Sequence, residues 1–278
     1  MRIDAHQHFW NYSAEEYPWI GAGMERLARD YLPADLGALA AAAGIGGTVA
    51  VQARQSLEES RWLLELAAAS PLVRGVVGWV DLRSDEVDRQ LEALAARPKF
   101  VGVRHVVQDE PDPRFLLGEA FGRGIGRLAR HGLVYDLLLY PVQLPAAAEL
   151  VRRFPEQPFV LDHLAKPRIS ERLFDPWRAD LAALAAATNV TCKLSGMVTE
   201  AAWGKWKRAD FVPYMETALE AFSPRRLMFG SDWPVCTLSA EYADVVGIVD
   251  DFLARLSPDE REAIRGGNAV RVYGLDTE

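Results

Sequence analysis

The chain begins Met1-Arg2-Ile3-Asp4-Ala5-His6-Gln7-His8, a short apolar run that ends in two histidines two residues apart. Because alternate residues of a β-strand point to the same side, His6 and His8 are predicted to point toward one spot. Near the other end, a second apolar run, Leu227-Met228-Phe229-Gly230, leads into Ser231-Asp232-Trp233-Pro234. An acid after a late strand and two histidines after the first predict one site closed between the two ends of the chain.

Working outward from these two stretches, short apolar segments alternate with helical segments rich in alanine and leucine. Continuous apolar runs are typical of strands buried on both faces of a parallel sheet. The predicted strands are 2–5, 47–52, 75–80, 100–104, 134–139, 159–162, 190–194 and 227–230. The clearest predicted helices are 33–43, 56–70, 84–96, 114–131, 174–187 and 241–255.

Eight strand–helix units without a linker or a change in composition predict one domain over residues 1–278, a (β/α)8 TIM barrel with parallel strands. The alternative is a doubly wound sheet, which usually carries a glycine-rich phosphate loop after its first strand. Here histidines stand at that place. Two long loops, 9–32 and 195–209, follow strands one and seven. Active sites of barrels lie at the carboxyl ends of strands, where long loops often act as lids.

Bulk properties limit the partners and the compartment. A net charge of −8 and a pI of about 5.3 argue against nucleic acid as a ligand. No apolar run approaches the length of a transmembrane helix, and no secretory signal is visible at the start. The only cysteines, Cys192 and Cys236, indicate a reducing compartment, so we expect a cytoplasmic protein with a small-molecule substrate. A homo-oligomer is compatible with the sequence.

Polar and aromatic residues collect where the predicted strands end. Four of the five histidines lie there, and only His131 falls elsewhere. The candidate site residues are His6, His8, Arg54, Trp79, Arg104, His105, His163, Lys193, Asp232 and Trp233. One such histidine alone is more often structural than functional, but the group favours a catalytic or metal site.

Two chemistries fit this group. His6, His8, His163 and Asp232 supply nitrogen and oxygen donors suited to one Zn²⁺ or a similar divalent ion, which would polarise a carbonyl and lower the pKa of a bound water. The same residues could act without metal, with Asp232 taking a proton from water while cationic side chains and histidines hold the carbonyl oxygen. The spacing leaves both open.

The remaining candidates are predicted to bind substrate, and all but Lys193 have a structural alternative. Arg54 and Arg104 would recognise substrate oxygens, or else form ion pairs on the rim. Lys193, inside a strand, would assist an oxyanion or bind substrate. The rings of Trp79 and Trp233 would offer flat apolar faces to a ring, or else belong to the core. His105 would bind substrate or pack.

Several segments together resemble the amidohydrolase superfamily, and within it the branch of sugar and aromatic lactonases. They span nearly the whole chain in the same order. The segments are Asp4-Ala5-His6-Gln7-His8-Phe9-Trp10, residues 31–36 and 51–55, Gly102-Val103-Arg104-His105, Asp162-His163-Leu164-Ala165-Lys166-Pro167, Lys193-Leu194-Ser195-Gly196, Phe229-Gly230-Ser231-Asp232-Trp233-Pro234 and Asn268-Ala269. A His-x-His pair alone is weak evidence, whereas the ordered set is specific.

The resemblance implies a barrel hydrolase that opens a sugar-derived lactone, of the L-fucono-, L-rhamnono- or L-galactono-lactone type, to its aldonic acid. It implies Asp232 as the general base, with His163 also catalytic, and His6, His8, His163 and Asp232 as ligands of a divalent metal. The predicted fifth strand has no histidine and the fourth no bridging lysine, so one ion or none is expected rather than two. The alternatives are a metal-dependent decarboxylase or lactonase acting on an aromatic acid, and a non-catalytic binding barrel.

Overall fold

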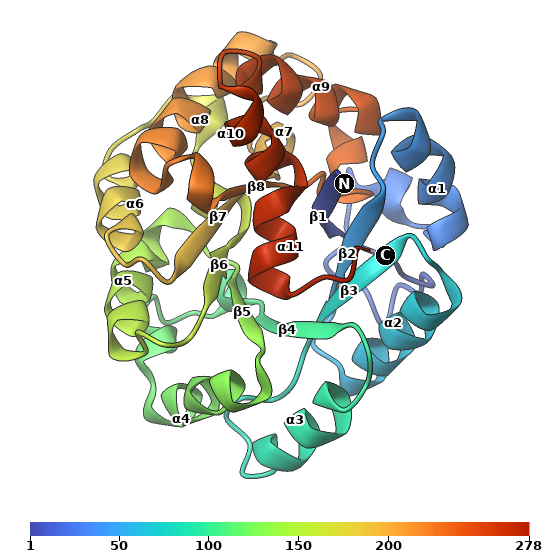
Figure 1. The fold of residues 1–278 in the computed structure, drawn as a ribbon, viewed down its shortest axis with the longest axis vertical. Coiled ribbons are helices and arrows are strands. Elements are labelled where there is room, and N and C mark those ends of the chain that lie inside the picture. The colour runs from blue at the N-terminus through green and yellow to red at the C-terminus, as the bar shows by residue number, and fades with distance from the viewer. Residues whose placement is uncertain (278) are drawn as a thin grey trace.

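A ring of parallel strands surrounded by helices forms the protein, as a computed structural model describes for residues 1–277 (Figure 1). Neighbouring strands pair in the order of the sequence, from the first to the eighth. The strands are β1 Ile3–Gln7, β2 Gly47–Val51, β3 Val73–Gly78, β4 Phe100–His105, β5 Val134–Leu137, β6 Phe159–Leu161, β7 Val190–Leu194 and β8 Leu227–Phe229. The predicted (β/α)8 barrel is confirmed, and the doubly wound sheet is excluded.

Helices cover the outside of this ring (Figure 1). Each predicted helix is present, and two further long helices, α5 and α8, complete the alternation. The helices are α1 Pro33–Ala42, α2 Leu57–Ala69, α3 Val87–Ala95, α4 Glu119–Leu128, α5 Leu144–Arg153, α6 Trp177–Ala185, α7 Met197–Glu200, α8 Arg208–Phe222, α9 Tyr242–Leu253, α10 Pro258–Glu262 and α11 Asn268–Tyr273. Within residues 1–277, no helix combines the length and apolar character needed to cross a bilayer.

The two ends of the chain close the barrel. The N–H of Asp232 donates to the carbonyl of His6 at 2.8 Å, and the N–H of His8 donates to the carbonyl of Trp233 at 2.7 Å. These bonds continue the strand ladder from β8 to β1. The predicted convergence of the early histidines and the late acid is therefore built into the backbone.

A bulge in β1 decides which way its histidines point. Between the pairs Asp4–Thr48 and Gln7–Ala50, three steps along β1 match two along β2, so β1 holds one extra residue. Ile3 and Ala5 pack among the apolar residues inside the barrel. Strict alternation after Ala5 would turn His6 outward, and the extra residue turns it inward instead.

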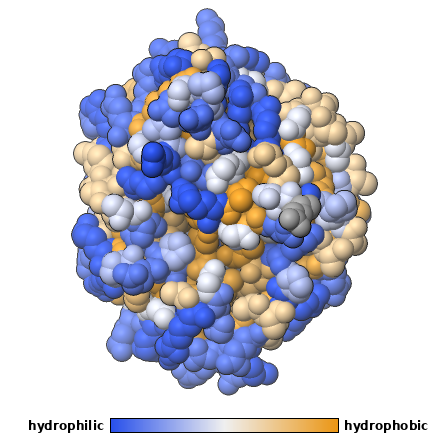
Figure 2. Space-filling view, in the orientation of Figure 1, coloured by the Kyte–Doolittle hydropathy of each residue, from blue (hydrophilic) through white to orange (hydrophobic). Residues whose placement is uncertain are grey.

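The core has two layers. The larger lies between strands and helices, and the smaller lies inside the barrel and includes Val49, Val77 and Val160. Tyr273 and Leu275, at the end of α11 and just beyond it, pack on this inner layer, so the C-terminal segment covers the amino-terminal mouth of the barrel (Figure 1). On that face Figure 2 shows hydrophilic residues around the periphery and hydrophobic ones toward the centre. The C-terminal segment does not cover the opposite mouth of the barrel, where a polar site can lie.

Two predicted segments differ in detail. Predicted helix 114–131 is interrupted because Gly118 adopts an extended ψ of 137°, so a short turn over Phe115–Leu117 precedes α4. The predicted loop 195–209 contains the short helix α7. Apolar periodicity runs through residues 114–131 and does not reveal a single extended residue, whereas α7 has only four residues and is too short to show a periodic pattern.

Candidate active site

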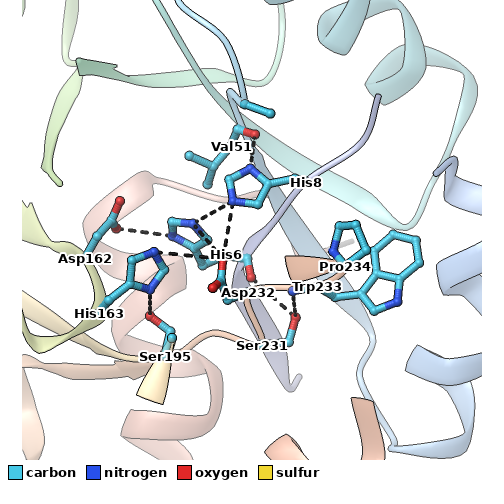
Figure 3. A network of polar contacts seen from close by, with 12 residues as sticks. His6, His8, Val51, Asp162, His163, Ser195, Ser231, Asp232, Trp233 and Pro234 are labelled. Carbon is cyan, nitrogen blue, oxygen red and sulfur yellow. Dashed lines mark hydrogen bonds and ion pairs between the residues drawn. The ribbon is translucent and has the colours of Figure 1, made fainter. Parts of the chain in front are cut away.

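Two histidine rings, from the end of β1 and the residue just after it, meet nearly at right angles inside the barrel mouth (Figure 3). The Nε2 atoms of His6 and His8 lie 3.2 Å apart. The other nitrogens are engaged elsewhere: Nδ1 of His8 lies 2.8 Å from the carbonyl oxygen of Val51, and Nδ1 of His6 lies 3.2 Å from Oδ1 of Asp162. Because a carbonyl only accepts, His8 carries its proton on Nδ1, which leaves its Nε2 lone pair directed at His6.

Asp232 and His163 complete this group. Oδ1 of Asp232 lies 3.4 Å from Nε2 of His8, 3.8 Å from Nε2 of His6 and 3.9 Å from Nε2 of His163. Nδ1 of His163 lies 2.8 Å from the Ser195 hydroxyl. All four residues predicted as metal ligands therefore meet at one point, each with a nitrogen or oxygen turned toward the others.

The backbone at this point is unusual. His163 and Asp232 both adopt left-handed conformations, with φ of 54° and 59°, which non-glycine residues rarely occupy. Gly196, with φ of 65°, lies so close that an added Cβ would come within 2.5 Å of Nδ1 of His163. The turn after β7 thus needs glycine in order to leave room for the imidazole.

Burial sets the protonation of these groups. It lowers the pKa of His163 to about 4 and holds the pKa of His6 well below its ordinary value. Burial would raise the pKa of Asp232, but the neighbouring histidines His163, His8 and His6 outweigh it and hold that pKa low. At neutral pH the site presents the Asp232 carboxylate and the neutral imidazoles of His6 and His163, which are the forms that bind metal and accept protons.

A buried ionic network lies next to His6. Lys193 places its ammonium 2.6 Å from Asp136 and 2.9 Å from Asp162, and Arg104 donates to Asp162 at 3.0 Å. The ammonium and guanidinium charges outweigh the burial of Asp162 and hold its pKa well below the ordinary value. Asp162 was not among the predicted site residues, although it directly precedes His163 at the end of a predicted strand.

These residues fit one divalent cation better than two. The 3.2 Å between the two Nε2 atoms suits two ligands of one ion at about 2.1 Å each, and their lone pairs would otherwise repel. The group His6, His8 and Asp232 is buried, as metal ligands commonly are. On β5, Asp136 is committed to Lys193 where a second metal would need another ligand.

A cavity of about 490 Å³ opens beside this group. Five predicted site residues line it: His8, Arg54, Arg104, His163 and Asp232. The cavity wall also includes residues that the sequence did not single out, namely Glu16, Trp19, Gln108, Leu138, Lys166 and Val235. Only Glu16 and Trp19 belong to a predicted long loop, 9–32, because which of the other residues reach the cavity depends on tertiary structure.

Four residues predicted to bind substrate do not line the cavity. Lys193 is wholly buried in the ionic network, and Trp233 is buried against Phe9 and Tyr31. His105 lies 2.7 Å from Glu110. The backbone of Trp79 is hydrogen-bonded to a serine of α2. Trp233 and His105 are therefore packed in the interior, as their structural alternatives describe, and Lys193 is paired with acids inside the barrel. A residue near the end of a strand can point into the mouth or away from it, and the sequence does not say which.

Comparison with known proteins decides the family. The amidohydrolase profile matches residues 3–275. The chain belongs to the amidohydrolase family. This amidohydrolase is 46% identical to an L-fucono-1,5-lactonase of Burkholderia multivorans, with 99% of this chain and 96% of that protein covered. An L-fucono-1,5-lactonase of Burkholderia ambifaria is 37% identical over the same shares.

A solved structure gives the same result for the fold. A Burkholderia multivorans amidohydrolase crystallised with bound zinc superposes with a TM-score of 0.94 at 46% identity, covering 99% of this chain and 100% of that one. Membership of a hydrolase family makes this protein an enzyme, so the prediction of an enzyme is confirmed and the non-catalytic binding barrel is excluded.

Proposed function

We propose that this amidohydrolase opens a sugar-derived lactone to its aldonic acid, with L-fucono-1,5-lactone as the first substrate to test and the L-rhamnono- and L-galactono-lactones next. The observation that carries the proposal is 46% identity, over nearly the whole chain, to a protein named for the first of these substrates. The alternative of an aromatic-acid decarboxylase has less support, because Asp136 stands on β5 where that chemistry would call for a histidine.

Asp232 is placed to serve as the base. A lactone carbonyl that enters the cavity meets the Asp232 carboxylate beside the imidazoles of His6, His8 and His163. Water adds to the carbonyl carbon as its proton passes to Asp232. The ring C–O bond then breaks, and the departing ring oxygen takes that proton, which leaves a hydroxy acid. His163, held by Ser195, keeps its Nε2 directed at Asp232 through this transfer.

A divalent ion fits this chemistry. His6, His8 and Asp232, with His163 beside them, would hold it, and zinc is bound in the similar Burkholderia multivorans structure. Once bound, it would supply Lewis acidity to the carbonyl and to water. Arg104 lies next to the same point, 3.4 Å from Nε2 of His6, and can stabilise the developing oxyanion.

The first experiment is hydrolysis of the three lactones by purified protein, followed by acid release above the spontaneous rate. Asp232→Asn should lower kcat roughly a hundred-fold or more, because a general base typically contributes 10²–10⁴-fold. Asp85→Asn, at an exposed position outside the cavity, is the matched control and should behave like the parent. Absence of hydrolysis at micromolar parent enzyme, or full activity in Asp232→Asn, would contradict the proposal.

A further inference from the structure

We propose that Glu16 sets the charge selectivity of this enzyme, by pairing with Arg54 so that the cavity accepts uncharged polyhydroxy lactones and rejects lactones that carry a carboxylate. This inference rests on the proposed function, because it names the substrate class of the same site. The observation behind it is that every cationic side chain lining the cavity already has an acidic partner within the chain.

Two of these cations carry charges that are already balanced by acids of the chain. Arg104 is 4% exposed at its side chain and is committed to Asp162 at 3.0 Å and to the carbonyl of Gln52. Lys166 lies 4.0 Å from a carboxylate oxygen of Glu200 and 5.5 Å from the ring centre of Tyr140. Neither presents an unmatched charge to the cavity.

Arg54 is different, because a single residue neutralises it. Its guanidinium donates to Oε1 of Glu16 at 2.6 Å, its side chain is 22% exposed, and its Nε is buried without a partner. Glu16 is 43% exposed and belongs to the long loop after β1. Glu16 thus stands where a substrate carboxylate would otherwise meet a guanidinium, the group best suited to bind it in a forked geometry.

Arg54 does not depend on Glu16 for its place. Its backbone N–H, and that of Ala53, donate to the buried carboxylate of Glu59 at 3.1 Å. Tyr17 adds a ring 5.6 Å from the guanidinium carbon. Removing the charge of Glu16 should therefore leave a cation held in position and ready for an anion.

The acidic residues that line the cavity also disfavour a substrate carboxylate. Four carboxylates line the cavity, those of Glu16, Asp109, Glu110 and Asp232, against three cations. Hydroxyl groups of a neutral lactone can donate to these acids or accept from the arginines. A substrate carboxylate beside Arg54 would meet the like charge of Glu16, because that guanidinium is already paired, and such contacts discriminate strongly against the wrong ligand.

The test compares two substrates that differ in one group. L-galactono-lactone carries an alcohol at C6, and the corresponding galactaro-lactone of the same ring size carries a carboxylate there. The parent should favour the alcohol by roughly tenfold or more in kcat/KM. Glu16→Gln should narrow that ratio about tenfold by raising kcat/KM for the acid, and 0.5 M salt should reduce the gain.

Two further variants separate charge from loop movement. Arg54→Gln added to Glu16→Gln should abolish the gain, because the freed cation is then absent. Glu241→Gln removes the 2.7 Å pair with Arg26 of the same loop outside the cavity, and should leave the ratio unchanged. Glu16→Ser repeats the test should Glu16→Gln fold poorly, as judged by its melting temperature.

The outcomes distinguish this inference from the proposed function. Equal use of both lactones by the parent, or an unchanged ratio in both Glu16 variants, would overturn the role of Glu16 alone. A shift of equal size in Glu241→Gln would also overturn it, since loop loosening would then explain the effect. Failure of the parent to hydrolyse either lactone would overturn the proposed function instead.

Discussion

At the scale of single residues, each site histidine is oriented by the nitrogen that faces away from the site. His8 donates to a backbone carbonyl, while His6 faces Asp162 and His163 faces Ser195. Such partners choose the tautomer and so decide which lone pair enters the site. The sequence placed the histidines together, but not these partners, since the contact of His6 with Asp162, for example, joins residues 156 positions apart.

Ser195 gives a clear test of this orientation. Ser195→Ala removes the hydroxyl 2.8 Å from Nδ1 of His163, so the ring loses the hydrogen bond that holds its orientation. We expect zinc affinity and kcat to fall about ten- to a hundred-fold, the usual cost of losing such a partner. Zinc competition with a chromophoric chelator measures the first, independently of turnover. Ser195→Thr keeps the hydroxyl and should restore both, whereas equal defects in the two variants would point to packing alone.

At the scale of elements, the β2–α2 unit shows how a connection holds a site residue. Ser56 caps α2 by accepting from the N–H groups of Glu58 and Glu59, and Glu59 in turn binds the backbone of the preceding turn. The sequence predicted this helix over 56–70, because a helical pattern follows Ser56. It did not predict that the carboxylate of Glu59 is buried, because an acid in the first turn of a helix is normally exposed to solvent.

Glu59 makes the stability of this element depend on pH. Burial raises its pKa from 4.5 to about 7, although hydrogen bonds from Arg54 and Ala53 oppose the shift. The unfolded chain releases this proton near pH 4.5 and the folded chain holds it to about 7, so the contribution to stability is lost as pH rises across that window. The free energy of unfolding of Glu59→Gln, relative to the parent, should rise by on the order of 3 kcal/mol from pH 4.5 to 8.

Urea unfolding at intervals across that range measures the difference directly. Asp4 and Asp136, whose pKa values burial raises to about 6, add the same trend to parent and variant, so subtraction removes them. Parallel curves for the two proteins would mean that Glu59 titrates alike in the folded and unfolded chains.

At the scale of the whole molecule, one ionic chain links the floor of the barrel to the site. Tyr273 of α11 donates to Asp136 at 2.8 Å, Asp136 pairs with Lys193, and Lys193 lies 3.2 Å from Nδ1 of His6. The apolar strand runs predicted the barrel well, because a continuous apolar run indicates a strand that is buried on both faces. They hid this network, because Asp136 and Lys193 each interrupt a run as a single polar residue whose partner comes from another strand.

Lys193 should therefore act through charge balance in the core rather than through substrate. Lys193→Met leaves Asp136 and Asp162 buried without their shared ammonium, and should cost about 3–5 kcal/mol in the free energy of unfolding. Lys193→Met combined with Asp136→Leu removes one charge of each sign, so it should be clearly more stable than Lys193→Met alone. Urea unfolding compares the two, and KM measured on both should stay near that of the parent. A large rise in KM with little loss of stability would instead place the ammonium against the substrate, contrary to its complete burial.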